Sequence, residues 1–503
     1  MSGEGARCAP DGEASDAVRT QDACSASASS EFLPKHSGFS TAERVLLVVF
    51  LLTLPFVTPR VRWDGIGYYA YARSVIVDHN LQFKGDWRDP RAEPFLFERD
   101  GRGVIHYLRV TKTGHIPNVY AVGPGILWAP LIATVHGAIL TLDYLGCAIP
   151  HDGHGKPYLY AMALASALYA FLGLWLSFRT ARDFVAEKWA FLATLAIWFA
   201  SSLPVYMYSD PSWSHADSVF AVGLFIWYWH RTRDGRTAGK WILWGLISGL
   251  MCDVYLANGA LLLLAAFDLL SEGRQQRAGR KFSPERVRSV LRSGMAYAAA
   301  FLAAFSPTLI VRQIIFGNPL AIGFYSSRPW NWASPKIWNV LASPSHGLVT
   351  TTPVLALAFL GVGLLWWRDR KAGGALLLAT SAFYLLIAVD PWWDGTISFG
   401  NRFFVSLTPI FIVGLAVALE SSTWIWRDSA AAVRRAAVVL AILIVWNLGL
   451  VYQLDRQMFP VVGHVDWGPV VYNQFRTVPG EVFHSIQAKV APERWDGESF
   501  RKS

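Results

Sequence analysis

The feature that most constrains this chain is a series of apolar segments, each close to the length of a membrane-spanning helix. The chain is 53% hydrophobic and only 16% charged, far less polar than a soluble protein. The candidate spans lie at 43–58, 121–142, 157–178, 189–206, 218–230, 241–270, 294–315, 348–367, 375–389, 403–420 and 436–453. The sequence therefore predicts an all-α polytopic membrane protein.

Five connecting loops are rich in Arg and Lys, and the positive-inside rule places all of them in the cytoplasm. These loops lie within 179–188, 231–240, 274–292, 368–371 and 427–435. They can share one side only if two of the apolar segments are not simple crossings.

Two departures from simple crossing solve this conflict. The long segment 241–270 is interrupted by Asp253 and Asn258, so we expect two helices that meet at a polar tip. The segment 121–142 begins with Pro124 and Gly125, so we expect a re-entrant or interfacial helix on the outer side. The result is a bundle of about eleven transmembrane helices with a cytoplasmic N-terminus and an outer C-terminus.

This topology also divides the chain. Residues 1–40 are rich in Ser, Ala, Gly and Asp, which predicts a disordered cytoplasmic tail. The transmembrane domain would cover 41–453, and a short outer tail would cover 454–503. The outer loops would be a large first loop with interfacial helices at 60–156, and further loops at 207–217, 316–347 and 390–402.

Composition and motifs exclude several other classes. The net charge of +9 comes mostly from the short basic loops, so it indicates topology rather than nucleic-acid binding. The four cysteines show neither metal-ligand spacing nor a disulfide framework. The sequence has no Walker loop and no dinucleotide fingerprint, and we found no two-fold repeat of the kind that many transporters contain.

The first candidate for chemistry is Asp64 in "WDGIGYY", directly after the first span. A helix that starts here would place Tyr68 and Tyr71 on the same face as Asp64. Asp is also a favoured N-cap residue, and the sequence alone leaves capping and catalysis equally open.

A second group lies in "YSDPSWSHADSVF", between two spans on the outer side. Asp210, His215 and Asp217 fall within a short, apolar-flanked segment. An acid at the end of a span can simply cap it, and a lone His is usually a satisfied polar residue. Three titratable groups so close together favour a site.

Two further stretches supply a histidine and an arginine. "SPSHGLVTTTPV" contains His346, although its Pro and Gly also fit a simple turn into a helix. "DPWWDGTISFGNRFF" contains Arg402, which suits bidentate phosphate binding but can also snorkel to the membrane surface.

In their order along residues 43–420, these stretches resemble integral-membrane glycosyltransferases of the GT-C class. The bacterial branch is the one resembled, near the protein mannosyltransferases and the lipid A aminoarabinose transferases. The resemblance also includes "GHIPNVYAVGPGILWAPL" and "GLISGLMCDVYLAN". One departure is Asp253 at the hairpin tip, where relatives commonly have Arg or Lys.

The resemblance implies roles for individual residues. Asp64 matches the first-loop acid that acts as catalytic base or orients the acceptor. Asp217, with Asp210 as competitor, matches the second-loop acid, and Arg402 matches an arginine that binds the donor phosphate. Weaker assignments to the donor pocket are His346, Lys112, His215 and Tyr68. A divalent metal such as Mg²⁺ or Mn²⁺, if used, would lie between Asp64 and Asp217.

The implied reaction moves a hexosyl or pentosyl group from a polyprenyl phosphate to a hydroxyl of a lipid, polysaccharide or protein, with inversion. Its expected place is the outer face of a bacterial inner membrane, as part of cell-envelope synthesis. The alternative is a transporter or flippase of lipid-linked sugars, which would use the same intramembrane acids. The polar residues gather in the outer loops rather than at mid-membrane, and this favours the enzyme.

Overall fold

The structure is a computed structural model that describes residues 39–87, 97–102, 104–107, 109–275, 284–321, 329–423 and 429–490. Contacts divide the chain into a unit Met1–Phe39 and a unit Ser40–Ser503. Apart from Phe39 the first unit lies outside the described residues. Of the disordered tail expected at 1–40, residues 1–38 lie outside the described part, whereas Ser40 caps α2. The following concerns the second unit.

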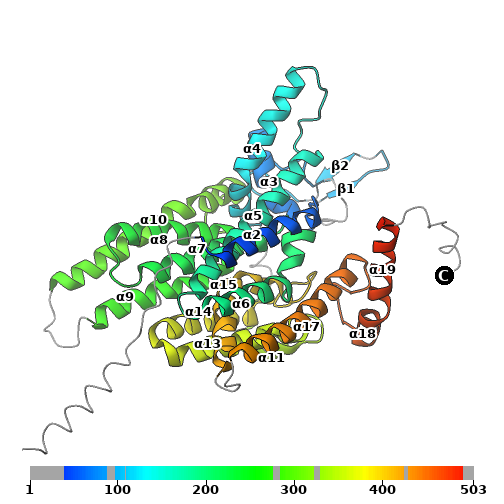
Figure 1. Cartoon of the computed structure of the whole chain (residues 1–503). Coiled ribbons are helices and arrows are strands. Elements are labelled where there is room, and N and C mark those ends of the chain that lie inside the picture. Colours follow the sequence, from blue (N-terminus) through cyan, green and yellow to red (C-terminus); the bar gives the residue numbers. More distant parts are fainter. Residues whose placement is uncertain are drawn as a thin grey trace, which may run out of the picture. The chain divides into compact units, whose positions relative to one another are not determined.

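Helices make up nearly all of this unit (Figure 1). The first half contains α2 (Thr41–Thr53), α3 (Asp64–Arg73), α4 (Gly123–Tyr144), α5 (Lys156–Ala181), α6 (Glu187–Phe199), α7 (Ser214–Thr232) and α8 (Ala238–Val254). The second half contains α9 (Leu263–Gln275), α10 (Pro284–Phe316), α11 (Ile337–Ala342), α12 (Leu348–Thr351), α13 (Val354–Arg368), α14 (Arg370–Val389), α15 (Thr408–Ser421), α17 (Ser429–Asp455), α18 (Trp467–Phe475) and α19 (Thr477–Val490).

The expected all-α class is confirmed, with one small addition. A two-stranded antiparallel hairpin in the first loop pairs β1 (Phe97–Arg99) with β2 (Ile105–Tyr107). Short 3₁₀ or π segments also interrupt the helices, among them η3 (Val205–Ser209), η4 (Leu256–Leu262) and η6 (Arg402–Leu407).

Six of the described helices are long and apolar enough to cross a membrane by length and composition. They lie at 123–144, 156–181, 287–316, 370–389, 402–421 and 430–455. The chain is therefore described as an integral membrane protein. The figure of about eleven spans stays a prediction.

Three of the basic loops, 179–188, 231–240 and 368–371, lie together at one end of the bundle, which we call the basic end. Arg233, after α7, pairs with Asp369, which caps α14, at 2.8 Å. Arg368, at the end of α13, pairs with Glu420 of α15 at 2.5 Å. These pairs connect helix ends far apart in sequence, as the positive-inside pattern predicts for loops that share one side.

The hairpin expected at 241–270 is present. Helix α8 stops at Val254, Tyr255 is extended, and the chain continues through η4 into α9. Arg236, just before α8, bonds to Asp268 of α9 at 3.1 Å, so the chain returns to the end where α8 began. Asn258 at the tip donates to Ser218 of α7 at 2.9 Å.

Helix α4 lies across the opposite end of the bundle, which we call the site end. Trp128, near its start, donates to Asp217 in the first turn of α7 at 3.2 Å. His136, two turns further on, bonds to Tyr158 in the first turn of α5 at 2.7 Å. Both partners are at the site end, and the second half of α4 extends beyond the other helices in Figure 1. Its placement at the membrane surface remains a prediction.

Close helix packing depends on small residues. A Cβ added to Gly361 of α13 would lie 1.6 Å from the Gly414 oxygen of α15. Helices α8 and α10 make a similar contact, where a Cβ on Gly245 would lie 2.4 Å from the Tyr297 oxygen. These glycines therefore set how closely the helices approach.

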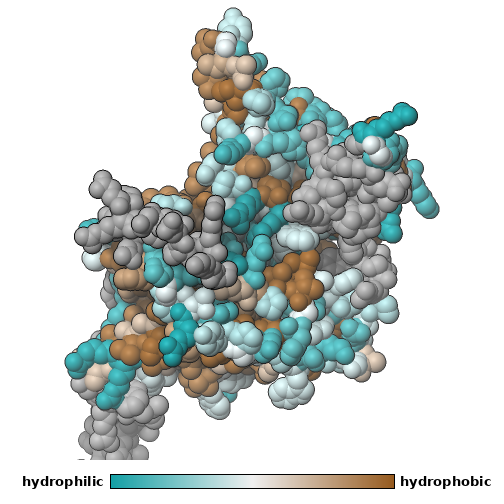
Figure 2. Space-filling model, turned by 90° about the vertical axis from the view of Figure 1, so that its right-hand side faces the viewer, coloured by the Kyte–Doolittle hydropathy of each residue, from teal (hydrophilic) through white to brown (hydrophobic). Residues whose placement is uncertain are grey.

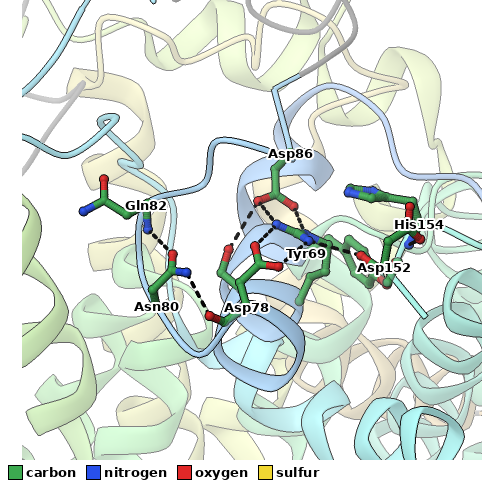
Figure 3. A network of polar contacts seen from close by, with 10 residues as sticks. Tyr69, Asp78, Asn80, Gln82, Asp86, Asp152 and His154 are labelled. Atoms are coloured by element: carbon green, nitrogen blue, oxygen red, sulfur yellow. Dashed lines mark hydrogen bonds and ion pairs between the residues drawn. The ribbon is translucent and has the colours of Figure 1, made fainter. Parts of the chain in front are cut away.

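A buried ion-pair network organises the first loop (Figure 3). Arg73, at the end of α3, binds Asp86 through Nε and Nη2 at 2.5 and 2.9 Å. It also binds Asp78 at 2.5 Å and the Asp152 carbonyl at 3.2 Å. Tyr69 adds a bond to the Gly153 carbonyl at 2.7 Å. The network thus fastens the return of the loop before α5 to the helix that starts at Asp64.

Candidate functional site

Asp64 is the first residue of α3 and does not cap it. The N-cap is Trp63, with a φ of 53°, and no side chain caps this helix. The capping alternative is therefore wrong. Asp64 instead accepts a hydrogen bond from Tyr120 at 3.3 Å and lies 2.8 Å from Arg402. The left-handed backbone at Trp63 is strained for a bulky residue, and strain of this kind is often found at functional sites.

Arg402 opens the 3₁₀ segment η6 and carries a nearly buried guanidinium. Its Nη1 atom lies 2.8 Å from Asp64 Oδ2, with 12% of the side chain exposed. The guanidinium also lies over the Trp213 ring, 4.3 Å from its centre. Its Nε and Nη1 atoms are buried without a hydrogen-bond partner, so the pair is electrostatic and not a well-aligned hydrogen bond. Buried donors left unused in this way favour an anionic ligand.

A tight turn places Arg402 there. Gly395 has a φ of 72° and Gly400 a φ of 61°, in the region that favours glycine. A Cβ on Gly395 would lie 3.1 Å from Arg402 Nε. The stretch "WWDGTISFGNR" therefore requires glycine both for its backbone and for space around the guanidinium.

Asp210 does not face Asp64 as a free acid. It forms a two-pronged ion pair with Arg62, with N–O distances of 2.5 and 3.0 Å. Its hydrogen bond and charge raise the pKa of Arg62 against the effect of burial. Because its charge is neutralised, Asp210 is better suited to holding the turn before α3 than to proton transfer.

Asp217 is fully buried in the first turn of α7. One carboxylate oxygen accepts from Trp128, and the other has no hydrogen-bond partner among the described residues. Its bond links α7 to α4. It joins neither Asp64 nor Arg402 in any hydrogen bond or ion pair of the described part of the chain.

The conditional assignment of Mg²⁺ or Mn²⁺ to Asp64 and Asp217 stays a prediction. Within the described ranges, no group of three or more His, Cys, Asp or Glu side chains could hold a metal ion. Asp64 is engaged by Arg402 and Tyr120, whereas Asp217 is engaged by Trp128. The two acids expected to share Mg²⁺ or Mn²⁺ therefore serve different partners.

His215 lies in the aromatic wall behind Arg402. Its ring is 4.9 Å from that of Tyr206 and 5.6 Å from that of Tyr255, and its Nδ1 atom has no partner among the described residues. Tyr255, at the hairpin tip, also stacks on Phe403. The tip thus reaches the site through an aromatic residue. Its Asp253 instead lies within electrostatic range of Arg312 on α10.

His346 contacts the turn that carries Arg402. Its Nδ1 atom is 3.3 Å from the Ser398 hydroxyl, in the same turn that carries Arg402. Burial lowers the pKa of His346 despite the nearby Asp394. A neutral imidazole in this place supports the turn and adds no charge to the donor pocket.

Of the two remaining candidates, Tyr68 lies next to the site and Lys112 does not. The Tyr68 ring is 5.1 Å from the Tyr120 ring, so it packs directly behind a partner of Asp64. Lys112 is exposed in a turn between Thr111 and Gly114, and none of its described contacts reaches Asp64 or Arg402.

Three residues of the site were missed from the sequence: Tyr120, Trp213 and Tyr255. Tyr120 and Trp213 lie in stretches quoted above, beside the glycine and acid patterns that drew attention. Their aromatic side chains could have suggested a binding site. In a chain with 23 Trp and 18 Tyr, however, an aromatic residue alone does not single out a position.

Figure 2 looks onto the site end. Hydrophilic residues gather in the middle of this face next to a smaller hydrophobic area, and hydrophobic residues cover the projecting part of α4. Such a surface allows a polar head group and an apolar chain to approach from the same side.

Comparison with known proteins gives matches only among solved structures. The sequence matches no protein-family model and no curated protein sequence. The structure is similar to ArnT from Cupriavidus metallidurans in the apo state, with 13% identity, a TM-score of 0.47, and coverage of 83% of this chain and 73% of that one. ArnT bound to undecaprenyl phosphate gives 14% identity, a TM-score of 0.45, and coverage of 82% and 72%.

A third similar structure is the Archaeoglobus fulgidus oligosaccharyltransferase with Zn and sulfate. It shows 15% identity and a TM-score of 0.43, with coverage of 80% of this chain and 52% of that one. The chain thus spans about half the length of that enzyme. These similarities concern the arrangement of helices, and the function of this chain depends on its own site. The neighbours are of the kind that the sequence resemblance to integral-membrane glycosyltransferases predicts.

Proposed function

We propose that this protein is a membrane glycosyltransferase that moves a sugar from a polyprenyl phosphate to an acceptor hydroxyl. The observation that carries the proposal is the Asp64–Arg402 pair at the site end, in which a nearly buried guanidinium retains unused donors. The pair offers the two functions that glycosyl transfer needs, a base and a cation for the leaving phosphate.

Donor binding would separate this pair. The donor phosphate competes with Asp64 for Arg402, whose planar fork suits two phosphate oxygens. Trp213 holds the guanidinium from behind, and Gly395 leaves space beside its Nε atom. Once released, the Asp64 carboxylate is available for the acceptor, with Tyr120 limiting its rotation.

The chemical step is a single displacement. The acceptor oxygen attacks the anomeric carbon, and its proton passes to an oxygen of Asp64. The bond from the anomeric carbon to the phosphate oxygen breaks, and its electron pair goes to the phosphate, which Arg402 stabilises. The product has the inverted configuration.

The location follows from the charge pattern. With the basic end in the cytoplasm, the site faces the outer side of the membrane, which is the periplasm in a bacterium with two membranes. Donor and acceptor would then meet at the outer leaflet. Envelope lipids, polysaccharides and proteins are the acceptor classes with hydroxyls on this side.

Reconstitution in vesicles distinguishes transfer from transport. The protein is supplied with a polyprenyl phosphate that carries a radiolabelled sugar, together with an extract of envelope acceptors. We expect the label to move to a water-soluble or otherwise lipid-distinct product, with release of polyprenyl phosphate. Movement of intact labelled lipid between leaflets, without release of polyprenyl phosphate, would instead identify a flippase.

A further inference from the structure

The segment after the last span is not a simple outer tail. Residues 456–466 lead into α18, which folds back along the end of α17. Gln474 of α18 donates to the Trp446 carbonyl of α17 at 3.0 Å. The ring of the next residue, Phe475, has its centre 6.3 Å from that of the Trp446 ring. Trp446 is nine residues before the end of α17, so α18 lies beside the span itself and not beyond it.

One polar side chain of α18, that of Gln474, points toward α17. Gln453 of α17 donates to the Gln474 side chain at 2.8 Å and to the Val470 carbonyl at 3.2 Å. Gln474 also fits against Gly449, where a Cβ would lie 2.1 Å from its Nε2 atom. The two amides are therefore joined by a hydrogen bond inside the α17–α18 contact.

Three large side chains of α18 point away from the protein, whereas Val470 is buried against it. Tyr472 is 65% exposed and Phe475 69% exposed, and Val471 lies next to them with 39% exposed. A buried glutamine on the same helix as large exposed apolar side chains is the reverse of what is expected on a helix in water. It is the arrangement expected where the surrounding solvent is hydrocarbon.

The exposed side of α18 continues an apolar face of α17. Ile442 and Val445 of α17 are 63% and 68% exposed, on a helix apolar enough to span a membrane. Helix α19 is held at the end of α17, where Tyr452 donates to Glu481 at 2.9 Å. The contact with Glu481 thus indicates which end of α17 faces water, and the exposed Tyr472 and Phe475 indicate which side of α18 faces lipid.

We propose that α18 is a membrane-embedded segment whose Val471, Tyr472 and Phe475 contact the acyl chains of the leaflet at the site end. The connecting segment ties it to the site region, because Trp467 donates to the Pro344 carbonyl at 2.8 Å and Val465 to the Ser345 hydroxyl at 3.1 Å. The position of α18 in the bilayer would thereby fix the position of the loop that carries His346.

Spin labels at single cysteines test this in the full-length protein. Cys8, Cys24, Cys147 and Cys252 are first replaced by Ser or Ala, and the protein is reconstituted in nanodiscs of phosphatidylethanolamine and phosphatidylglycerol. Labels are placed at Tyr472→Cys and Phe475→Cys. Val445→Cys serves as the acyl reference and His464→Cys, in the exposed connecting segment, as the water reference.

We expect the labels at 472 and 475 to collide with oxygen more than with a water-soluble nickel complex, with a ratio close to that at 445 and above that at 464. If a label disturbs folding, Val471→Cys provides a third position on the same face. Nickel accessibility equal to that at 464 would overturn the proposal. Protection from both reagents would also overturn it, because another protein surface would then cover α18.

Discussion

The two ends of the bundle differ in how their buried arginines are paired with acids. At the basic end, arginines form well-directed hydrogen bonds with acids on neighbouring helix ends, as in Arg233–Asp369 and Arg236–Asp268. At the site end, Arg402 lies close to Asp64 but leaves two buried nitrogens without a hydrogen bond.

This difference indicates what each end is for. The directed pairs of the basic end connect the helix termini and keep the bundle together, although Arg233 Nη1 and Asp268 Oδ1 are also buried without a hydrogen-bond partner. The difference at the site end is that the Arg402 nitrogen closest to Asp64 is itself one of the atoms without a hydrogen bond. Although burial opposes it, the backbone bond from Ala372 and the bond from Arg233 keep the pKa of Asp369 below its usual value. An incomplete pair between a buried cation and an acid keeps both groups available, and such groups are concentrated at functional sites.

The largest effect is expected from removing the site-end cation. Arg402→Gln should lower sugar transfer by about 100- to 1000-fold, the range found when one donor to a developing negative charge is lost. Arg233→Gln is the matched control, since it removes a basic-end arginine that is also mostly buried. Initial rates of transfer in vesicles measure both. Equal losses in the two variants would remove the functional distinction between the ends.

Removing an arginine from the basic end should lower the stability of the protein. Arg236 and Asp268 are almost completely buried, so Arg236→Met should destabilise the protein by about 3–5 kcal/mol because it leaves an unpaired buried carboxylate. The double variant Arg236→Met with Asp268→Leu should recover most of this loss. Thermal unfolding in detergent measures both. A single variant as stable as the wild type would mean that this pair is not structural.

A smaller effect concerns pH and His346. Its pKa is lowered by burial, so below its ordinary value near 6.5 the unfolded chain takes up a proton that the folded protein does not. The contribution of neutral His346 to the free energy of unfolding is therefore fully present above this pH, and it decreases as the pH falls toward the pKa in the folded protein. His346→Gln should flatten this part of the pH profile of the melting temperature. An unchanged profile would show that His346 does not titrate in this way.

The sequence predicted those features that are set by local pattern. Charge predicted that the basic loops share one end, which the structure shows for 179–188, 231–240 and 368–371, and the polar interruption at Asp253 and Asn258 predicted the hairpin. The meeting of Asp64 and Arg402 came only from the family resemblance, since 338 residues separate them and no local signal links them. Their geometry depends on how the helices pack.

Other features could not be obtained from pattern. The Asp64 carboxylate was equally compatible with a helix cap until Trp63 proved to hold that place. Arg62 was not recognised as the partner of Asp210, because a short-range preference does not specify a contact across the fold. The stretch "WGPVVYNQF" contains Gly, Pro and two amides and so resembled a tail, but its Gln474 bonds to α17, a contact that no local pattern specifies.

The central claim is that donor phosphate and Asp64 compete for Arg402, and the Asp64→Asn variant tests it most directly. Binding of polyprenyl phosphate and sugar transfer are measured on the same preparation. We predict that transfer is lost, since the amide cannot accept the acceptor proton, while the lipid phosphate binds as tightly as in the wild type or more tightly. Full transfer activity, or binding weakened to the level of Arg402→Gln, would contradict this account.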